Sequence, residues 1–180
     1  MRKRELVGSC DQSVFRFVNP RYSSAKEMFA GKGALYVDGR WLLQGEALAS
    51  YCSLLPETAF AEALSANRYY GFPDNKSAPL VFVTARVKLK KVIDLSDGSV
   101  RSKLRFSLKF VVETDWRREN YAGREAITQA WGWAFARAGV EGILCPSAAH
   151  REGMNLIVFP RNLLKSSRLQ VTSEVEWPRE

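Results

Sequence analysis

Three polar side chains that could do chemistry stand close together in this sequence, each among apolar neighbours. Arg40 follows a glycine, Tyr51 lies within a mainly apolar run, and Glu62 is flanked by alanines. A guanidinium can hold a phosphate through two parallel hydrogen bonds, and an aromatic ring can stack on a flat ligand. A carboxylate among small apolar side chains either belongs to a solvated helix face or is a costly placement that serves a function. The second interpretation makes Glu62 a candidate catalytic group.

A fourth candidate, Ser147, lies far downstream. It follows a proline at the end of an apolar segment that we expect to form a buried strand over residues 140–145. Taken alone, a Pro-Ser pair is more typical of a turn than of a binding site. Its hydroxyl could also hydrogen-bond a sugar or a phosphate, so Ser147 is kept as a candidate ligand beside that interpretation.

The pattern around these candidates predicts the elements that position them. A proline suited to a first helical turn and the apolar spacing predict a helix over residues 56–68, and Glu62 borders its buried stripe. Tyr51 lies in a strand expected over residues 47–53. An Asp-Gly turn directly precedes Arg40, so this side chain leaves a tight bend in a defined direction.

The remaining pattern mixes short strands with a few helices and shows no alternating βαβ period, which indicates a mixed α+β fold. At 180 residues the chain is most simply one domain, residues 1–180, with residues 1–13 as a flexible arm. It contains no Gly-rich motif of the Rossmann or P-loop type. We expect further strands over residues 14–18, 34–37, 80–89, 92–95, 155–159 and 168–177, and further helices over residues 99–110 and 123–138.

The clearest helical pattern covers residues 123–138. Its apolar residues recur three or four positions apart, which predicts one buried stripe. Gly139 would end this helix. The predicted stripe consists of Ile127, Ala130, Trp131, Ala134, Phe135 and Ala138.

The net charge is +8, from 27 basic and 19 acidic residues. Such a charge fits a solubilising surface or an anionic partner such as a nucleotide, a nucleic acid or an acidic protein. Because the basic residues are scattered and form no stripe interleaved with aromatics, we expect no direct nucleic-acid binding. A non-catalytic basic domain that binds a nucleotide or nucleic acid remains an alternative to an enzyme.

The cysteine and histidine content excludes several kinds of site. Cys10, Cys52 and Cys145 show no CxxC spacing, which argues against a disulfide framework and against a zinc site. With His150 as the single histidine, we expect no metal site. A Cys–His nucleophilic pair is formally possible but disfavoured. No apolar run is long enough for a membrane helix, and no apolar stretch follows the basic N-terminus, so we expect a cytoplasmic protein.

Four motifs occur in an order that characterises one known family. They are Gly39-Arg40-Trp41, then Tyr51, then Pro56-Glu57-Thr58-Ala59 leading to Ala61-Glu62, and finally Gly142-Ile143-Leu144-Cys145-Pro146-Ser147-Ala148. Asn155-Leu156 and Phe159 follow at about the spacing that this family shows. In these motifs, and over roughly residues 14–172, the chain resembles the RES domain family.

The resemblance implies a fold similar to that of ADP-ribosyltransferases, a split mixed sheet with a nucleotide cleft. It implies NAD as the substrate, no cofactor, and water or inorganic phosphate as the acceptor. Glu62 would then stabilise positive charge on the ribose, Arg40 would hold the diphosphate, and Tyr51 would stack on the nicotinamide. Ser147 would bind the ribose or a phosphate. The loop that carries Arg21 borders the cleft in this family, so Arg21 is either a second phosphate ligand or a solvated arginine.

The resemblance also implies a biological role and a partner. RES domains are associated with NAD degradation as the toxin half of a toxin–antitoxin pair, so we expect a helix-turn-helix antitoxin as the partner. Whether this chain forms a homo-oligomer within that complex is left open. An acidic element of the antitoxin that pairs with Arg40 or Arg21 would block the cleft. An ADP-ribosyltransferase that modifies a macromolecule is the alternative enzyme. A ribonuclease-type toxin is disfavoured by the single histidine.

Overall fold

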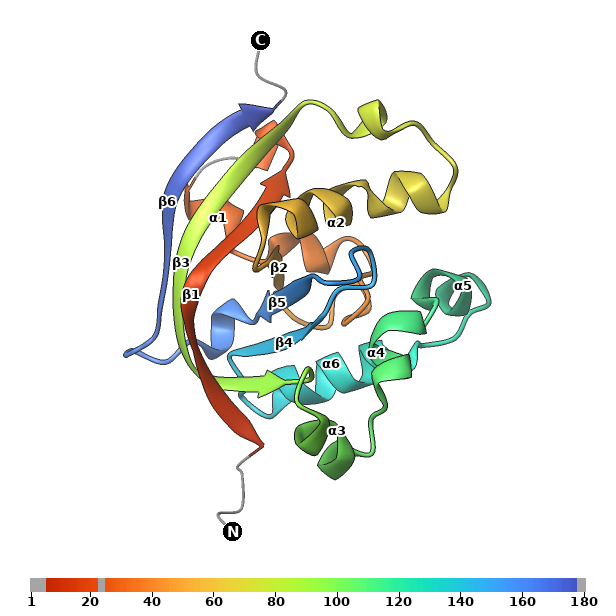
Figure 1. The fold of residues 1–180 in the computed structure, drawn as a ribbon, viewed down its shortest axis with the longest axis vertical. Coiled ribbons are helices and arrows are strands. Elements are labelled where there is room, and N and C mark those ends of the chain that lie inside the picture. The colour runs from red at the N-terminus through yellow and green to blue at the C-terminus, as the bar shows by residue number, and fades with distance from the viewer. Residues whose placement is uncertain (1–5, 23–24, 178–180) are drawn as a thin grey trace.

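A mixed β-sheet organises the protein (Figure 1). The computed structural model describes residues 6–22 and 25–177, and six strands lie within these residues. They are β1 (Val7–Val18), β2 (Ser50–Ser53), β3 (Leu80–Asp94), β4 (Gly142–Pro146), β5 (Met154–Val158) and β6 (Arg168–Trp177). Their order is β1-β2-β5-β4-β3-β6, and β1 also pairs with β3. The β3–β4 pair is parallel and the other described pairs are antiparallel, which confirms a mixed sheet.

The long strand β3 closes the sheet into a ring. One edge of β3 pairs with β1, and the other edge pairs first with β6 and then, at residues 92–94, with β4. Since β1 also meets β2 at the pair Phe15–Ser53, the path β1-β2-β5-β4-β3 returns to β1. The expected break between residues 89 and 92 is wrong, because pairing with β4 satisfies the backbone at the far end of β3.

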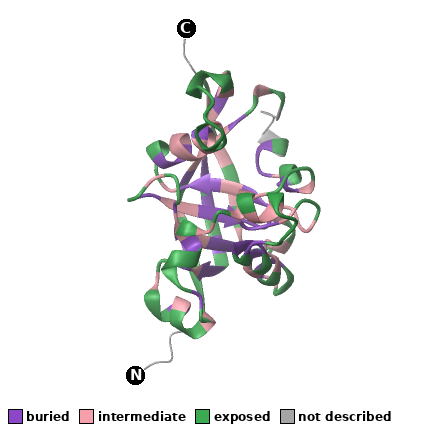
Figure 2. Ribbon diagram, turned by 90° about the vertical axis from the view of Figure 1, so that its right-hand side faces the viewer, coloured by how far each residue is buried: buried purple, intermediate pink, exposed green. Residues whose placement is uncertain are grey.

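Two hydrophobic cores lie on the two faces of the sheet. Alternate residues of β3 are buried in the first core, together with residues of β1 and β5. The second core joins β4 and β5 to the helices of the second half of the chain. Figure 2 shows buried residues gathered on the strands in the middle of the molecule. The largest fully buried side chains of the second core include Trp41, Phe106, Ile143 and Phe159.

The helices form two groups. They are α1 (Ala25–Met28), α2 (Pro56–Tyr69), α3 (Gly98–Leu104), α4 (Leu108–Glu113), α5 (Trp116–Tyr121) and α6 (Ile127–Arg137), with short 3-10 helices at Pro20–Tyr22, Lys32–Leu35, Asp74–Ser77 and Pro160–Asn162. Helix α2 packs on β1 and β2, whereas α4 and α6 pack on β4. In Figure 1, α2 lies above β4 and β5, α3 and α6 lie below them, and α4 and α5 lie toward the right.

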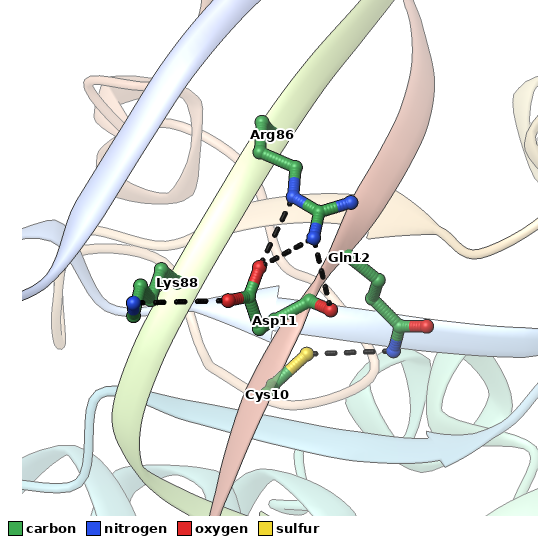
Figure 3. Close-up of polar contacts among 5 residues, drawn as sticks. All are labelled: Cys10, Asp11, Gln12, Arg86 and Lys88. Atoms are coloured by element: carbon green, nitrogen blue, oxygen red, sulfur yellow. Dashed lines mark hydrogen bonds and ion pairs between the residues drawn. The ribbon is translucent and has the colours of Figure 1, made fainter.

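Strand β1 takes the place of most of the expected N-terminal arm. Residues 7–13 pair with β3, so the prediction of a flexible arm is wrong for this part, and residues 1–5 lie outside the described residues. The outer face of this part of β1 is polar, so its sequence shows no clear alternation of apolar and polar residues that would predict a strand. Asp11 on this face binds Arg86 at 2.6 Å and Lys88 at 3.9 Å across the strand pair (Figure 3). These ion pairs are half exposed and contribute little stability, but they fit the observed register.

Three other expected elements differ from the structure. Residues 34–35 of the strand expected over 34–37 belong to the 3-10 helix Lys32–Leu35, and residues 36–37 form a turn after it. The strand expected over residues 47–53 shortens to β2. The helix expected over residues 99–110 divides into α3 and α4. The division occurs where Arg105 adopts a left-handed backbone with φ of 53°, which no helix interior can accommodate.

Helix α6 begins at Ile127 and buries a different face from the one predicted. Its buried residues are Thr128, Gln129, Gly132, Phe135 and Ala136, whereas Ala130 and Ala134 of the predicted stripe are exposed. The buried face of α6 is determined by its close contact with the backbone of Trp41. A Cβ at Gly132 would lie 1.7 Å from the carbonyl oxygen of Trp41. In addition, Gln129 Nε2 donates to the carbonyl oxygen of Gly39 at 2.9 Å. Helix α6 thus fixes the turn that carries Arg40.

Candidate active site

Glu62 is the centre of a hydrogen-bonded cluster. It is half buried on α2, a helix that begins with Pro56 at its first position. Its Oε1 accepts a hydrogen bond from Ser147 Oγ at 2.6 Å and another from Asn155 Nδ2 at 2.5 Å. No hydrogen bond to Oε2 occurs among the described residues. The carboxylate is therefore oriented through one oxygen, and the other oxygen is available to a ligand.

Ser147 and Asn155 are themselves held by the strands that carry them. Ser147 is buried just beyond the end of β4, and its Oγ accepts from the backbone amides of Ala149 and His150 at 3.1 and 3.0 Å. Asn155 on β5 uses its Oδ1 to accept from Ser53 Oγ of β2 at 2.7 Å. The cluster thus links β2, β4 and β5 to α2. Such satisfied polar networks fix side-chain positions.

The loop between β4 and β5 is fastened to the start of α2. Thr58 Oγ1 and His150 Nδ1 are 2.7 Å apart and share a hydrogen bond. A Cβ at Gly153 would lie 2.4 Å from Thr58 Oγ1, so only glycine permits this approach. The loop is closed by the amide of Ser147, which donates to the carbonyl oxygen of Gly153 at 2.8 Å. His150 therefore serves to position the loop beside Glu62.

Arg40 lines the same cleft as Glu62 and is held by the end of α4. Its Nη1 donates to the carbonyl oxygens of Val111 and Thr114, at 3.3 and 2.9 Å, at the end of α4. Burial lowers the pKa of Arg40, and the negative charge of Glu62 opposes that shift. The guanidinium keeps donors beyond the one bound to α4, so it can hold an anion in a fixed orientation.

Tyr51 lies deeper than the other candidates. It pairs with Ile157 of β5 and packs against the second core. Its hydroxyl touches the turn before Arg40, since a Cβ at Gly39 would lie 2.6 Å from it. Burial raises the pKa of Tyr51, so the phenol stays neutral. Tyr51 is not one of the cleft residues, and its stacking on a ligand stays a prediction.

A cleft of about 280 Å³ opens between α2, α5 and the β4–β5 loop. It brings Arg40 and Glu62 together, with Ser147 bound to Glu62 directly behind them. A larger and flatter hollow of about 360 Å³ at α3 contains arginines but no carboxylate, so it is the weaker candidate. The cleft is lined by Arg40, Ala61, Glu62, Ser65, Arg68, Tyr69, Arg117, Ala148 and Ala149.

The sequence did not predict a role for Arg68, Tyr69 or Arg117, which also line the cleft. Both Arg68 and Tyr69 occupy the last turn of α2. Tyr69 is seven residues after Glu62 and so shares its helix face, and helical spacing could have identified it. Arg68 lies six residues after Glu62, which is off that face, so spacing alone could not have identified it. Arg117 lies on the short helix α5, whose sequence has no apolar period. A role for Asn155 was also not predicted, although it belongs to a motif that was noted.

The remaining candidates do not join the cleft. Arg21 lies in the 3-10 helix Pro20–Tyr22, is exposed, and is not a lining residue, so its role as a phosphate ligand stays a prediction. Cys10, Cys52 and Cys145 are buried free thiols, and burial raises the pKa of Cys52 to about 12. Within the described residues there is no group of side chains that could hold a metal ion, and no helix there is long and apolar enough to span a membrane.

Comparison with known proteins places this chain in a family. No curated protein sequence matches the chain at a significant level. One solved structure with a similar fold is the crystal structure of the M. tuberculosis MbcT-MbcA toxin–antitoxin complex. The TM-score is 0.73 at 19% identity, over 94% of this chain and 86% of that chain. The RES domain family matches residues 13–179, almost the whole sequence. The chain therefore belongs to the RES domain family, as its motifs predicted.

Proposed function

We propose that this protein is the toxin component of a toxin–antitoxin system and that it cleaves the nicotinamide–ribose bond of NAD. The observation that carries this proposal is the Glu62 carboxylate, which two donors orient through Oε1 beside the cationic Arg40 in one cleft. Membership of the RES family and the fold similarity to a toxin–antitoxin complex support it. We also infer that the mixed sheet is related to that of ADP-ribosyltransferases.

The proposed reaction needs electrostatic stabilisation more than proton transfer. When the bond between the ribose carbon and the nicotinamide nitrogen breaks, nicotinamide leaves with the electron pair and positive charge develops on the ribose. The Glu62 carboxylate would stabilise that charge, because a fixed anion at a developing cation lowers the barrier. Arg40 would hold the diphosphate, Ser147 would bind the ribose or a phosphate, and Tyr51 would stack on the nicotinamide.

The acceptor decides the product. Water would add hydroxide to the ribose carbon, release a proton and give ADP-ribose. Inorganic phosphate would add to the same carbon and give the corresponding sugar phosphate. A transfer to a macromolecule is the third outcome, and we regard it as the alternative enzyme.

The partner in this proposal is a helix-turn-helix antitoxin. The solved complex with a similar fold contains an antitoxin, and this chain carries a net charge of +8. An acidic element of the antitoxin would enter the cleft and pair with Arg40, or pair with Arg21 outside the cleft, and would exclude NAD.

The test is nicotinamide release by the purified protein, followed over time with and without phosphate. We expect NAD to be consumed, with ADP-ribose or its phosphate as the second product. Glu57 is exposed on the same helix, so Glu57→Gln is the matched control for Glu62→Gln. If NAD stays intact with folded protein under both conditions, the proposed activity is wrong. If NAD is consumed only with a labelled macromolecule, the transferase alternative replaces it.

A further inference from the structure

The cleft extends beyond the groups that the proposed reaction uses. Glu62, Ser65 and Tyr69 line it from one face of α2. At about 1.5 Å of rise per residue, the helix from Glu62 to Tyr69 spans roughly 10 Å. The end at Tyr69, here called the distal end, can therefore take a second part of a ligand whose reacting bond lies at Glu62.

Arg117 brings positive charge to the distal end. Among the residues that the structure describes, Arg117 has no ion pair, whereas both carboxylate oxygens of Asp74 bind Arg68. Burial is the main cause of the lowered pKa of Arg40, and the nearby charge of Arg117 adds to it. Two neighbouring guanidinium groups in one cleft favour an anionic ligand between them.

The distal end also has a preorganised stacking surface. The guanidinium of Arg117 lies over the ring of Tyr69 at 5.1 Å and over the ring of Trp116 at 4.3 Å. The Tyr69 hydroxyl donates to the Asp115 carboxylate, at 3.0 and 3.1 Å from its two oxygens. This bond fixes the ring although Tyr69 is 46% exposed. A stacked arginine keeps its in-plane N–H groups free for a phosphate, and nucleobases stack on tyrosine and arginine planes.

We propose that Tyr69, Arg117 and Ser65 form a subsite for the adenosine-phosphate half of a dinucleotide, with Arg117 on the phosphate and the base against the Tyr69–Arg117 stack. This rests on the proposed function for its substrate, because it places the scissile bond at Glu62. Arg117 and Tyr69 are then specificity-determining residues. They make the enzyme select a dinucleotide through contacts away from the reacting bond.

The experiment measures the binding of ADP, which has no scissile bond, to the full-length protein by calorimetry. We expect Arg117→Ala to weaken ADP binding about 10- to 100-fold, the loss typical of a hydrogen-bonded charged contact. Arg118 is exposed, adjacent in sequence and not a lining residue, so Arg118→Ala is the matched control and should bind like the parent protein. Equal weakening by the two variants, or no weakening by Arg117→Ala, overturns the subsite.

Tyr69 provides a second and independent test. Tyr69→Phe keeps the ring, so it should retain most ADP binding, whereas Tyr69→Ala should lose it about tenfold. Tyr121 is 96% exposed, and Tyr121→Ala serves as the control for a surface tyrosine. ADP binding unchanged in Tyr69→Ala overturns the stacking role. Circular dichroism compares the fold of each variant with that of the parent protein. If Arg117→Ala does not fold, Arg117→Lys replaces it. The same weakening of ADP binding is expected, because lysine lacks the planar fork of N–H donors.

The two proposals fail in different ways. If ADP binding depends on Arg117 but NAD is not consumed, the subsite stands and the proposed activity is wrong. If NAD is consumed but ADP binding and the KM for NAD do not respond to Arg117→Ala, the activity stands and the subsite is wrong. The expected result is a KM for NAD raised about 10- to 100-fold, with kcat changed far less.

Discussion

Ser147 Oγ donates a hydrogen bond of 2.6 Å to Glu62 Oε1 and so joins two residues that are 85 positions apart in the chain. The bond connects the end of β4 to the middle of α2. Asn155 of β5 donates to the same oxygen. Because both donors use one oxygen, the carboxylate is fixed in direction while its second oxygen stays free for a ligand. This arrangement explains the first two predictions.

We expect Glu62→Gln to lower the rate of NAD cleavage about 10²- to 10³-fold with little change in stability. The amide oxygen of glutamine can still accept from Ser147 and Asn155, so the cluster keeps its geometry and loses only its negative charge. The measurements are nicotinamide release and thermal unfolding. The control Glu57→Gln should keep the parent rate. Turnover near that of the parent protein in Glu62→Gln would show that the Glu62 carboxylate is not catalytic.

Asn155→Ala should lower kcat about 10- to 100-fold and leave the KM for NAD nearly unchanged. It deletes one of the two donors that orient Glu62, and a hydrogen bond to a charged group is worth about 1.5–3 kcal/mol. Asn155 is a positioning residue, because it acts through Glu62. The control is Asn162→Ala, which removes hydrogen bonds to the carbonyl oxygens of Ala136 and Val140 outside the cleft. It should reduce stability only. If Asn155→Ala lowered only the stability and left kcat unchanged, the positioning role of Asn155 would be contradicted.

The parts of this site that the sequence could predict are those that depend on local pattern. Pro56 and the apolar spacing predict the helix that carries Glu62, and the family motifs identify Arg40, Tyr51 and Ser147. The meeting of Ser147 with Glu62 depends on the pairing of β4 with β5, which no local pattern contains. Arg117 was missed for a similar reason, since Tyr69, with which it lines the cleft, comes from the distant helix α2.

The elements that the sequence predicted wrongly share one physical cause: tertiary contacts override weak local signals. The stripe predicted for α6 counted Ala130 and Ala134 as buried, but alanine fits either face of a helix. The contact between Gly132 and the backbone of Trp41 decides which face is buried. Likewise Lys90 and Lys91 look like a strand end, yet β3 continues because β4 pairs with its last residues.

Arg40→Ala should raise the NAD concentration needed for half-maximal rate, and Arg40→Lys should rescue the activity poorly. A lysine carries the charge but cannot bind α4 and a phosphate at once through a planar fork. The measurement is the KM for NAD, for which we expect an increase of about tenfold or more in both variants. Arg118→Lys is the control outside the cleft. Full rescue by Arg40→Lys would mean that Arg40 contributes only charge.

Gly132→Ala should destabilise the protein by about 1–3 kcal/mol or more, the range for an added methyl in a packed core. The new Cβ would overlap the carbonyl oxygen of Trp41, so α6 or the turn before Arg40 must move. Gly33 has nothing within 4 Å of such a Cβ, which makes Gly33→Ala the control. Urea unfolding measures both variants. Equal stability in the two variants would show that α6 tolerates a shift here.

The last prediction concerns a buried carboxylate outside the cleft. Glu141 has an exposed fraction of 0%, and its Oε2 accepts from the amides of Lys90 and Lys91 at 2.6 and 2.8 Å. Its Oε1 accepts from the amide of Leu164 at 2.9 Å. Burial alone would raise the pKa of Glu141, but the hydrogen bonds from the Ser167 side chain and from these three amides outweigh it, and the pKa is lowered. The ionised carboxylate thus ties the middle of the chain to the segment after β5.

A carboxyl whose pKa is lower in the folded than in the unfolded state binds fewer protons when folded. Its stabilisation is therefore complete above the ordinary glutamate pKa of 4.5 and is lost as the pH falls through the folded-state pKa. Glu141→Gln should cost about 2–4 kcal/mol at neutral pH, because its amide NH₂ would face a backbone donor. Urea unfolding between pH 7 and pH 3 should show this difference shrinking in acid. The exposed Glu174→Gln should show no such change, and a difference for Glu141→Gln that is constant with pH would contradict the ionised role.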